Sequence, residues 1–186
     1  GGTESRFAVM MTSRARTIGM GKTNFRNASG LHHPSQVSSA RDMAKMARYI
    51  LKRYPHYYGY FSTKNFTYEG KTYRNHNRLM NTYKGMDGFK TGYINASGFN
   101  LVASAKRDGR RLIGVVFGGR STQTRNDHMA EILDAGFAKA DKVRIASVKT
   151  PPLPPSKPGY GSAQLAQAAV AQHMAGPKNF TSLSAI

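Results

Sequence analysis

The tripeptide Lys90-Thr91-Gly92 places a cation, a hydroxyl group and a residue without a side chain in consecutive positions. The lysine supplies positive charge for a ligand carboxylate or for proton transfer. The glycine lets a ligand backbone lie close to the chain, and the N–H group of the next residue, Tyr93, can then point at a developing oxyanion. A tripeptide of this kind also arises by chance, so the surrounding segments decide whether it belongs to a site.

These surroundings predict a small antiparallel sheet. Apolar and β-branched runs predict three strands, at residues 89–92, 101–105 and 112–117. The pair Asp108-Gly109 is a strong hairpin signal between the last two strands, and the near-continuous apolar run of the third predicts burial on both its faces. If the first is an ideal edge strand, Lys90 and Gly92 line a cleft that Thr91 shares only through a twist or bulge.

Three further segments show helical periodicity. The first runs from Thr3 to about Gly19 and has apolar residues at helical spacing, namely Phe7, Met10, Met11, Ala15 and Ile18. The second opens with the capping pattern Ser39-Ala40-Arg41-Asp42 and ends before Pro55. The third runs from Thr122 to about Ala140 and turns one apolar side inward, with Met129, Ile132, Leu133, Gly136 and Phe137. The segment "NFTYEGKTYRNH" predicts a hairpin that turns at Glu69-Gly70.

The composition changes near residue 150. Five of the eight prolines fall within "KTPPLPPSKPGYG", which is typical of an extended, semi-rigid spacer. We therefore expect one folded region at residues 1–146, a proline-rich linker at 147–161, and at 162–186 a tail that is either unstructured or an isolated helix.

Charge is the outstanding feature of the composition. The chain has 28 Lys and Arg residues against 9 Asp and Glu residues, a net charge of +19, which attracts polyanions such as nucleic acid, anionic lipid or acidic wall polymer. The basic residues are scattered, however, which is also what solvated surfaces produce. No zinc-finger, helix-turn-helix or RNA-binding aromatic pattern occurs, so no specific nucleic acid is expected. The histidines lack paired ligand spacing, cysteine is absent, and no metal or other cofactor is implied.

In this context the chain resembles the penicillin-recognising serine enzymes, whose third signature is Lys-Thr-Gly. The flanking segments resemble specifically the low-molecular-weight serine-type D-alanyl-D-alanine carboxypeptidases, over roughly residues 1–140. The segments that carry the resemblance, in the family's order, are "MTSRARTIGM", "NFRNASGL", "SSARDMAKMARYIL", "MDGFKTGY" and "GFNLVASAKRDGRRLIGVVFGG". The resemblance implies an α/β fold, an antiparallel sheet packed with helices as in β-lactamases.

The resemblance also implies roles for individual residues. Lys90 and Thr91 would contact the terminal carboxylate of a D-Ala-D-Ala peptide or of a β-lactam, next to Gly92, and the Tyr93 N–H would complete the oxyanion hole. Arg120 matches a family arginine near the carboxylate pocket, although an arginine at a strand end also commonly faces water. The segment "NHNRL" holds another candidate, and whether Arg78 or His76 takes that place is left open.

Two family signatures are absent. No Ser has Lys three residues later, and no Ser has Asn or Asp two residues later. We expect both motifs to lie upstream of Gly1, so the fold is incomplete here, and the chain alone is predicted to be inactive because it lacks the nucleophile.

The predicted function is hydrolysis of the C-terminal D-Ala from peptidoglycan stem peptides through a serine acyl-enzyme, in an exported protein of the bacterial periplasm or cell envelope. Attachment to the membrane surface or the wall would use regions outside this chain. The alternatives are a related transpeptidase, endopeptidase or β-lactamase, or a non-catalytic basic fragment that binds cell wall.

Overall fold

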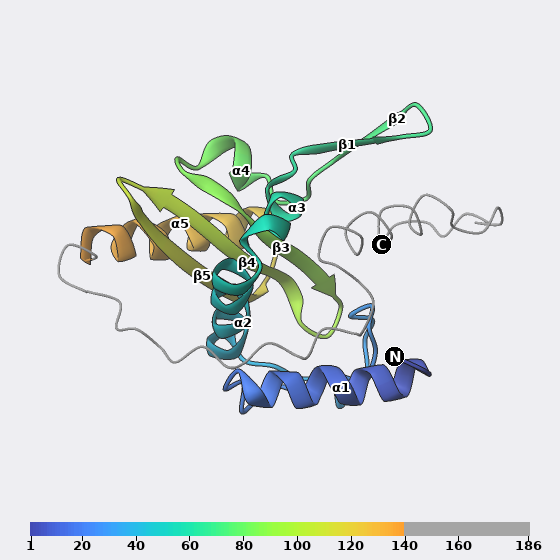
Figure 1. The fold of residues 1–186 in the computed structure, drawn as a ribbon. Helices are drawn as coiled ribbons and strands as arrows, with labels where there is room; N and C mark the ends of the chain where they lie inside the picture. The colour runs from blue at the N-terminus through green and yellow to red at the C-terminus, as the bar shows by residue number, and fades with distance from the viewer. Residues whose placement is uncertain (140–186) are drawn as a thin grey trace. The chain divides into compact units, whose positions relative to one another are not determined.

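The computed structural model describes residues 1–139, so the predicted linker and tail lie outside the described residues. Figure 1 shows the order of the elements. The helices are α1 (Glu4–Thr17), α2 (Ala40–Arg53), the 3₁₀ helix η1 (Pro55–Tyr57), α3 (Gly59–Ser62), α4 (Leu79–Thr82) and α5 (Thr122–Lys139). The strands are β1 (Asn65–Tyr68), β2 (Lys71–Arg74), β3 (Met86–Ile94), β4 (Gly98–Arg107) and β5 (Arg110–Gly119). The three long helices, the hairpin and the three further strands therefore confirm the predicted elements.

The main sheet is an antiparallel meander in the order β3-β4-β5. Its middle strand, β4, is the most deeply buried, with every residue from Leu101 to Ala105 buried. The predicted packing of the 112–117 strand on both faces is confirmed for most of its length, because Leu112 and Val116 pack in the cluster with α5, and Ile113 and Val115 pack in the cluster with α2. Only at its end does the prediction fail, since Phe117 is 42% exposed. An apolar run alone does not distinguish a central strand from an edge strand whose other face is covered by a helix.

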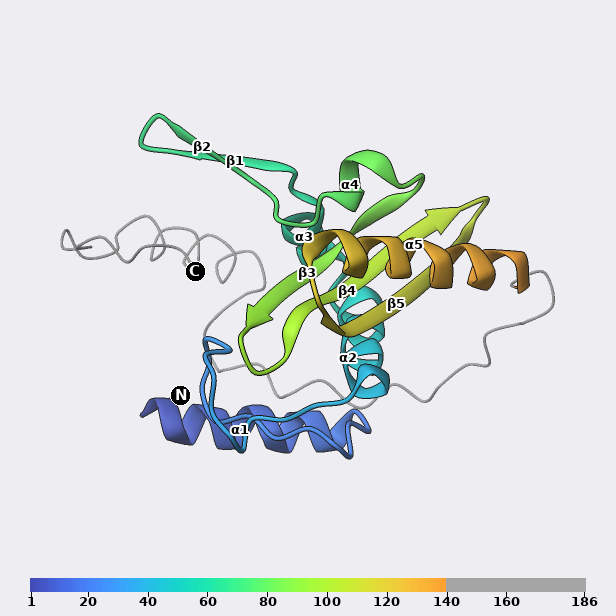
Figure 2. The same ribbon diagram turned by 180° about the vertical axis from the view of Figure 1, so that it is seen from behind.

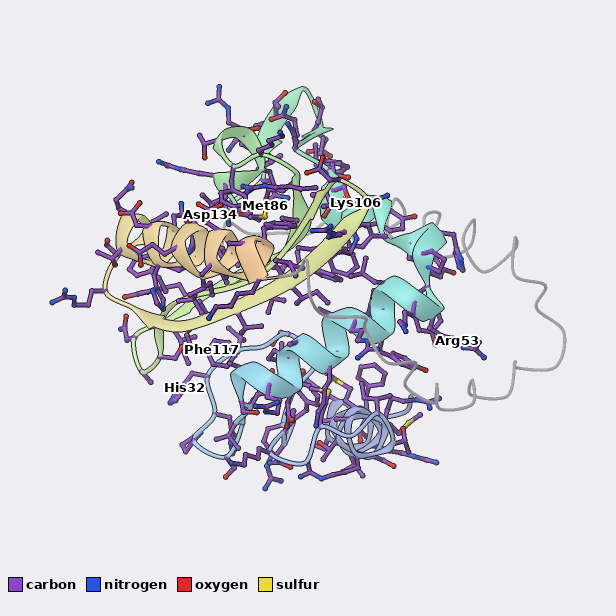
Figure 3. All side chains as sticks on the ribbon, turned by 90° about the vertical axis from the view of Figure 1, so that its left-hand side faces the viewer. His32, Arg53, Met86, Lys106, Phe117 and Asp134 are labelled. Carbon is purple, nitrogen blue, oxygen red and sulfur yellow. The ribbon has the colours of Figure 1, made fainter. Side chains whose placement is uncertain are left out.

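Helices cover both faces of this sheet. On one face α5 packs Met129 and Leu133 against Leu101 and Val116, and on the other Ala47 of α2 packs with residues of the sheet. Figures 2 and 3 show α5 and α2 on opposite sides of the strands, and Figure 3 also draws the side chains between these helices and the sheet. These two helices hold β4 in a fixed register, and β4 in turn supports the edge strand β3.

The N-terminal helix begins where the capping residue Thr3 accepts a hydrogen bond from the Arg6 N–H. Its buried residues are Ala8 and Ala15. The predicted apolar side was therefore partly wrong, since Phe7 is 41% exposed and Met10 is 53% exposed. Small side chains occupy the buried side of α1, which leaves the larger ones without cover among the described residues.

The loop between α1 and α2 is fixed by the buried carboxylate of Asp42. Asp42 accepts hydrogen bonds from the Lys22 N–H at 2.7 Å and from the Thr23 hydroxyl at 2.9 Å, and it pairs with Lys45 at 3.6 Å. Burial alone would raise the pKa of Asp42, but these hydrogen bonds and the Lys45 ammonium outweigh burial, and the pKa is lowered from 3.8. The carboxylate therefore stays charged and holds the loop on the first turn of α2.

The region between α2 and β3 holds the predicted hairpin and three short helical segments that the sequence analysis did not predict. The strands β1 and β2 pair with each other, whereas η1, α3 and α4 are short helical turns. The β1–β2 hairpin projects away from the main sheet (Figure 1). None of the helices within residues 1–139 has the length and apolar character needed to cross a bilayer.

Candidate active-site wall on strand β3

The tripeptide lies on β3, which is an edge strand of the main sheet. Lys90 is exposed, Thr91 is half-buried, and each pairs with a buried residue of β4, Val102 and Leu101 respectively. The register shift in this ladder falls between Met86 and Gly88, ahead of the tripeptide. Because the ladder is regular through the tripeptide itself, Lys90 and Thr91 direct their side chains to opposite faces. A ligand strand added at this open edge would thus have one of them on each side.

Gly92 is surrounded by open space. A Cβ built at this position meets no heavy atom within 4 Å, in contrast to Gly114, where a Cβ would lie 2.5 Å from the Met129 sulfur. The fold therefore needs glycine at position 114 for helix packing, but it has no steric need for glycine at position 92. An open backbone at an edge is what the close approach of a ligand backbone requires.

Lys90 and Tyr93 have few protein partners. The Lys90 ammonium donates a hydrogen bond to the Thr91 carbonyl oxygen at 2.8 Å, and none of the ion pairs among residues 1–139 includes Lys90. The Tyr93 ring lies 4.5 Å from that of Phe99, and its hydroxyl group donates to Asn95. The aromatic contact holds the Tyr93 ring against the neighbouring strand β4. The Tyr93 backbone belongs to the edge strand β3.

A polar network fixes the strand just before the tripeptide. Arg111 on β5 forms a two-pronged ion pair with Asp87, at 2.7 Å for each contact. The Tyr58 hydroxyl donates to the same carboxylate at 2.8 Å, and burial, together with Asp87, raises the pKa of Tyr58 to about 12. At physiological pH the tyrosine therefore remains a neutral donor, and the network ties β3 to β5 and to the segment before α3.

The predicted arginine candidates lie in different places. The register aligns Gly119, Phe99 and Tyr93 in one row across the three strands. Arg120 follows Gly119, so it lies at the end of the sheet where β3 ends. Its side chain is exposed. Arg78 precedes α4 and is exposed, as is His76. No described contact joins either of them to the tripeptide, so their roles stay predictions.

The structure reveals a further cation, Arg125, that the sequence reasoning missed. Arg125 is only 3% exposed, and its guanidinium donates to the Asn126 side chain at 2.8 Å and to the Asn100 carbonyl oxygen at 3.4 Å. Burial lowers its pKa, and among residues 1–139 no carboxylate pairs with it. Because Asn100 is the ladder partner of Gly92, this buried charge lies next to the strand pair that carries the tripeptide.

The position of Arg125 is electrostatically unfavourable. It lies in the first turns of α5, where the helix dipole disfavours a positive charge, and the burial of an unpaired charge adds to the cost. The only signal in the sequence was a second arginine shortly after the "GGR" that ends the strand.

No group of three or more metal-ligating side chains gathers anywhere in the described part of the chain. The exposed ammonium group of Lys90 on the edge strand suits an anionic ligand, such as a carboxylate, whereas Arg125 is buried and acts on this edge only through Asn100. The arrangement is thus able to hold an anionic group beside an accessible strand edge.

Comparison with known proteins relates this geometry to one family. Residues 1–121 match the model of the peptidase S11 family, described as D-alanyl-D-alanine carboxypeptidase. The D-alanyl-D-alanine carboxypeptidase DacD of Salmonella typhimurium is 38% identical over 145 residues, which cover 77% of this chain and 37% of that protein. The chain therefore spans well under half the length of this relative.

Solved structures agree with this match. Penicillin-binding protein 5 of Haemophilus influenzae has a TM-score of 0.71 at 36% identity, over 74% of this chain and 41% of that one. Penicillin-binding protein D2 of Listeria monocytogenes, solved with ampicillin bound, has a TM-score of 0.67 at 27% identity, over 72% of this chain and 56% of that one. The predicted α/β fold, in which helices pack on an antiparallel sheet, is thereby confirmed for the matched region.

Proposed function

The chain belongs to the peptidase S11 family of D-alanyl-D-alanine carboxypeptidases, and from this premise we propose that it forms the substrate-carboxylate wall of a serine D-Ala-D-Ala carboxypeptidase acting on peptidoglycan stem peptides. The observation that carries the proposal is the tripeptide on an open edge strand, with Lys90 exposed and Gly92 facing empty space. A peptide would add to β3 as an antiparallel strand, a common mode of peptide recognition.

Each residue then has a definite task. Lys90 and Thr91 bind the terminal carboxylate of the peptide, or the equivalent carboxylate of a β-lactam, from the two sides of the edge strand. The Tyr93 N–H points at the oxyanion that forms when the peptide carbonyl is attacked. Arg120 and Arg78 are further candidates for the carboxylate pocket, and Arg125 adds positive potential behind Gly92 through its contact with Asn100.

The attacking serine is the part of this mechanism that the chain does not contain. Acylation requires an activated nucleophile, and neither Ser-x-x-Lys nor Ser-x-Asn occurs in the sequence. We therefore propose that the serine is supplied from outside these residues, that water deacylates the enzyme, and that the 186-residue chain alone does not react with penicillin.

The test uses the full gene product that carries this chain and a fluorescent penicillin. Lys90→Ala should slow acylation by at least about tenfold, because a charge-assisted hydrogen bond to the ligand carboxylate is lost. Lys106→Ala, which removes an exposed lysine from the neighbouring strand β4, is the matched control. If Lys90→Ala reacts as fast as the control, Lys90 does not belong to the site.

The products distinguish the proposal from related activities. A D-Ala-D-Ala pentapeptide should yield free D-Ala and a tetrapeptide, whereas a transpeptidase would join the acyl group to an added amine. A β-lactamase would instead release hydrolysed penicillin rapidly. If the gene product neither labels with penicillin nor cleaves the peptide but binds cell wall in a strongly salt-dependent way, the basic, non-catalytic alternative replaces the proposal.

A further inference from the structure

The β1–β2 hairpin has one aromatic face and one polar face. Its register pairs Phe66 with Tyr73 and Tyr68 with Lys71, so these four side chains share a face. We call Phe66, Tyr68 and Tyr73 the aromatic platform. On the reverse face Thr67 and Thr72 are joined by a hydrogen bond of 3.1 Å.

The aromatic platform is open to solvent. Phe66 is 55% exposed, Tyr68 46% and Tyr73 47%. The rings of Phe66 and Tyr68 are nearly parallel, with an interplanar angle of 9°, and the Lys71 ammonium lies 5.3 Å from the centre of the Tyr73 ring. The Phe66 and Tyr68 rings therefore stack on each other, with centroids 6.4 Å apart, and the three exposed rings form an apolar patch of the kind that suggests a binding surface.

A pocket continues the platform at the base of the hairpin. It has a volume of about 290 Å³, and Tyr60, Phe66 and Tyr73 supply its aromatic lining. Lys64, Asn65 and Arg74 also line it. Neither Lys64 nor Arg74 takes part in an ion pair among residues 1–139. By the register, Asn65 and Arg74 belong to the reverse face, so residues of both faces line the pocket at the base of the hairpin. The lining combines aromatic side chains, an amide group and uncompensated positive charge.

The hairpin is anchored to the strand that carries the candidate site. The Ser62 hydroxyl donates to the Asp87 carbonyl oxygen at 2.7 Å, and the buried Asn77 side chain donates to the Gly88 carbonyl oxygen at 3.1 Å. At the base, the Asn75 side chain donates to the Thr63 carbonyl oxygen at 2.9 Å. These contacts hold the base of the hairpin at β3, two residues before Lys90.

We propose that the aromatic platform and its pocket bind the glycan strand of peptidoglycan while a stem peptide of that strand occupies the β3 edge, an inference that rests on the proposed function. The C–H faces of sugar rings carry partial positive charge and stack on the negative faces of aromatic rings. The Asn65 amide suits the N-acetyl groups of amino sugars, and Lys64 and Arg74 suit the carboxylates of stem peptides. Because the base of the hairpin is hydrogen-bonded to β3, the platform and the β3 edge belong to connected segments, and a stem peptide has a reach of about 17 Å when extended.

Two other occupants fit the hairpin less well. A loop that inserts into a membrane presents apolar groups at its tip, whereas this hairpin turns at Glu69-Gly70, both exposed. Single-stranded nucleic acid also stacks on aromatic rings, but it carries a phosphate at each nucleotide and would need a longer line of cations than this hairpin offers. Both serve as competitors in the test.

The test is a calorimetric titration of the full gene product with the soluble glycan strands that an amidase releases from purified peptidoglycan by removing the stem peptides. The double variant Phe66→Leu/Tyr73→Leu keeps apolar bulk but removes the stacking faces. It should lower the apparent affinity by about tenfold, since each aromatic contact is worth roughly two- to tenfold. Thr67→Val on the reverse face is the matched control and should bind as the unmodified protein does.

Several results would overturn the proposal. The first is that the double variant and the control bind glycan equally well. The second is that binding to glycan disappears for all proteins at about 0.5 M salt. The third is that the double variant loses binding to anionic vesicles or to an oligonucleotide while its binding to glycan is unchanged. A fall in melting temperature with unchanged glycan binding would mean that the platform is buried against another part of the protein. Penicillin labelling is measured in parallel: if the unmodified protein is not labelled, the proposed function fails, whereas labelling with unaltered glycan binding means that only the platform proposal fails.

Discussion

Arg125 donates a hydrogen bond to the carbonyl oxygen of Asn100 at 3.4 Å. Asn100 in turn is the ladder partner of Gly92, and its side chain forms hydrogen bonds with two other segments. It donates to the Ser97 hydroxyl at 2.7 Å and accepts from the Gly118 N–H at 3.1 Å. One asparagine thus connects the buried cation, the turn between β3 and β4, and the end of β5.

We expect Arg125→Met in the full gene product to separate stability from reactivity. The change removes a buried cation without a carboxylate partner, so the free energy of unfolding should stay the same or rise by about 1 kcal/mol. Acylation by penicillin should slow by about tenfold, because the positive potential behind Gly92 is lost. Urea denaturation and labelling kinetics measure the two effects, with the exposed Arg26→Met as control. A less stable variant with an unchanged labelling rate would assign Arg125 a purely structural role.

Gly92→Ala should leave the fold intact and impair the site. The added methyl group meets no protein atom within 4 Å, so the free energy of unfolding should change by less than about 0.5 kcal/mol. Labelling by penicillin should slow, because the methyl group lies where a ligand backbone approaches. Gly85→Ala is the matched control: with φ of +80° and the Lys106 carbonyl oxygen against it, it should cost about 2 kcal/mol or more. Equal labelling of Gly92→Ala and the unmodified protein would argue against an approach at this edge.

The Asp87–Arg111 pair should show measurable coupling. Both side chains are about 70% buried, with exposed fractions of 30% and 28%, and the contact is two-pronged. A double-mutant cycle with Asp87→Asn and Arg111→Met should give a coupling energy of about 1–2 kcal/mol. The Arg107–Asp134 pair, in which Asp134 is 60% exposed, should give no more than about 0.5 kcal/mol. Equal coupling in the two cycles would contradict the role given to Asp87 in fixing β3.

Asp42 should make the protein sensitive to acid. Its pKa in the folded protein lies below 3.8, its ordinary value, so the carboxylate contributes stability above about pH 4 and loses it as the pH falls through the folded-state pKa. Asp42→Asn should therefore be less stable than the unmodified protein at neutral pH and show a shallower loss of stability between about pH 4 and pH 2. Urea denaturation over this range measures the effect. The exposed Asp127→Asn is the control, and parallel pH profiles for all three proteins would exclude the anchoring role of Asp42.

Features set by neighbouring residues could be predicted from the sequence. Ser39 caps α2 as expected, its side chain accepting from the Asp42 N–H, and Asp108-Gly109 forms the β4–β5 turn, with positive φ at both residues. Such signals are local, because a cap or a tight turn depends on the few residues that make it. The family motif located the tripeptide for the same reason, since it is a continuous stretch of sequence.

Features set by packing could not be predicted in this way. The burial of Arg125 depends on the packing of α5 against Asn100 of β4 and Gly119 of β5, which no local sequence pattern encodes. Likewise, Ala8 and Ala15 are buried while Phe7 is 41% exposed, an arrangement that depends on which segments pack against α1 rather than on how apolar its residues are. The identity of the central strand also depends on sheet order rather than on how apolar each strand is.

The meander of β3, β4 and β5 also bears on how this region acquires its structure. The three strands are consecutive, and only short turns separate them. Closing short loops costs little chain entropy, and topologies dominated by contacts between sequence neighbours fold fast. The strand that bears Lys90 can therefore reach its final register from its own sequence neighbours, ahead of slower docking by more distant segments.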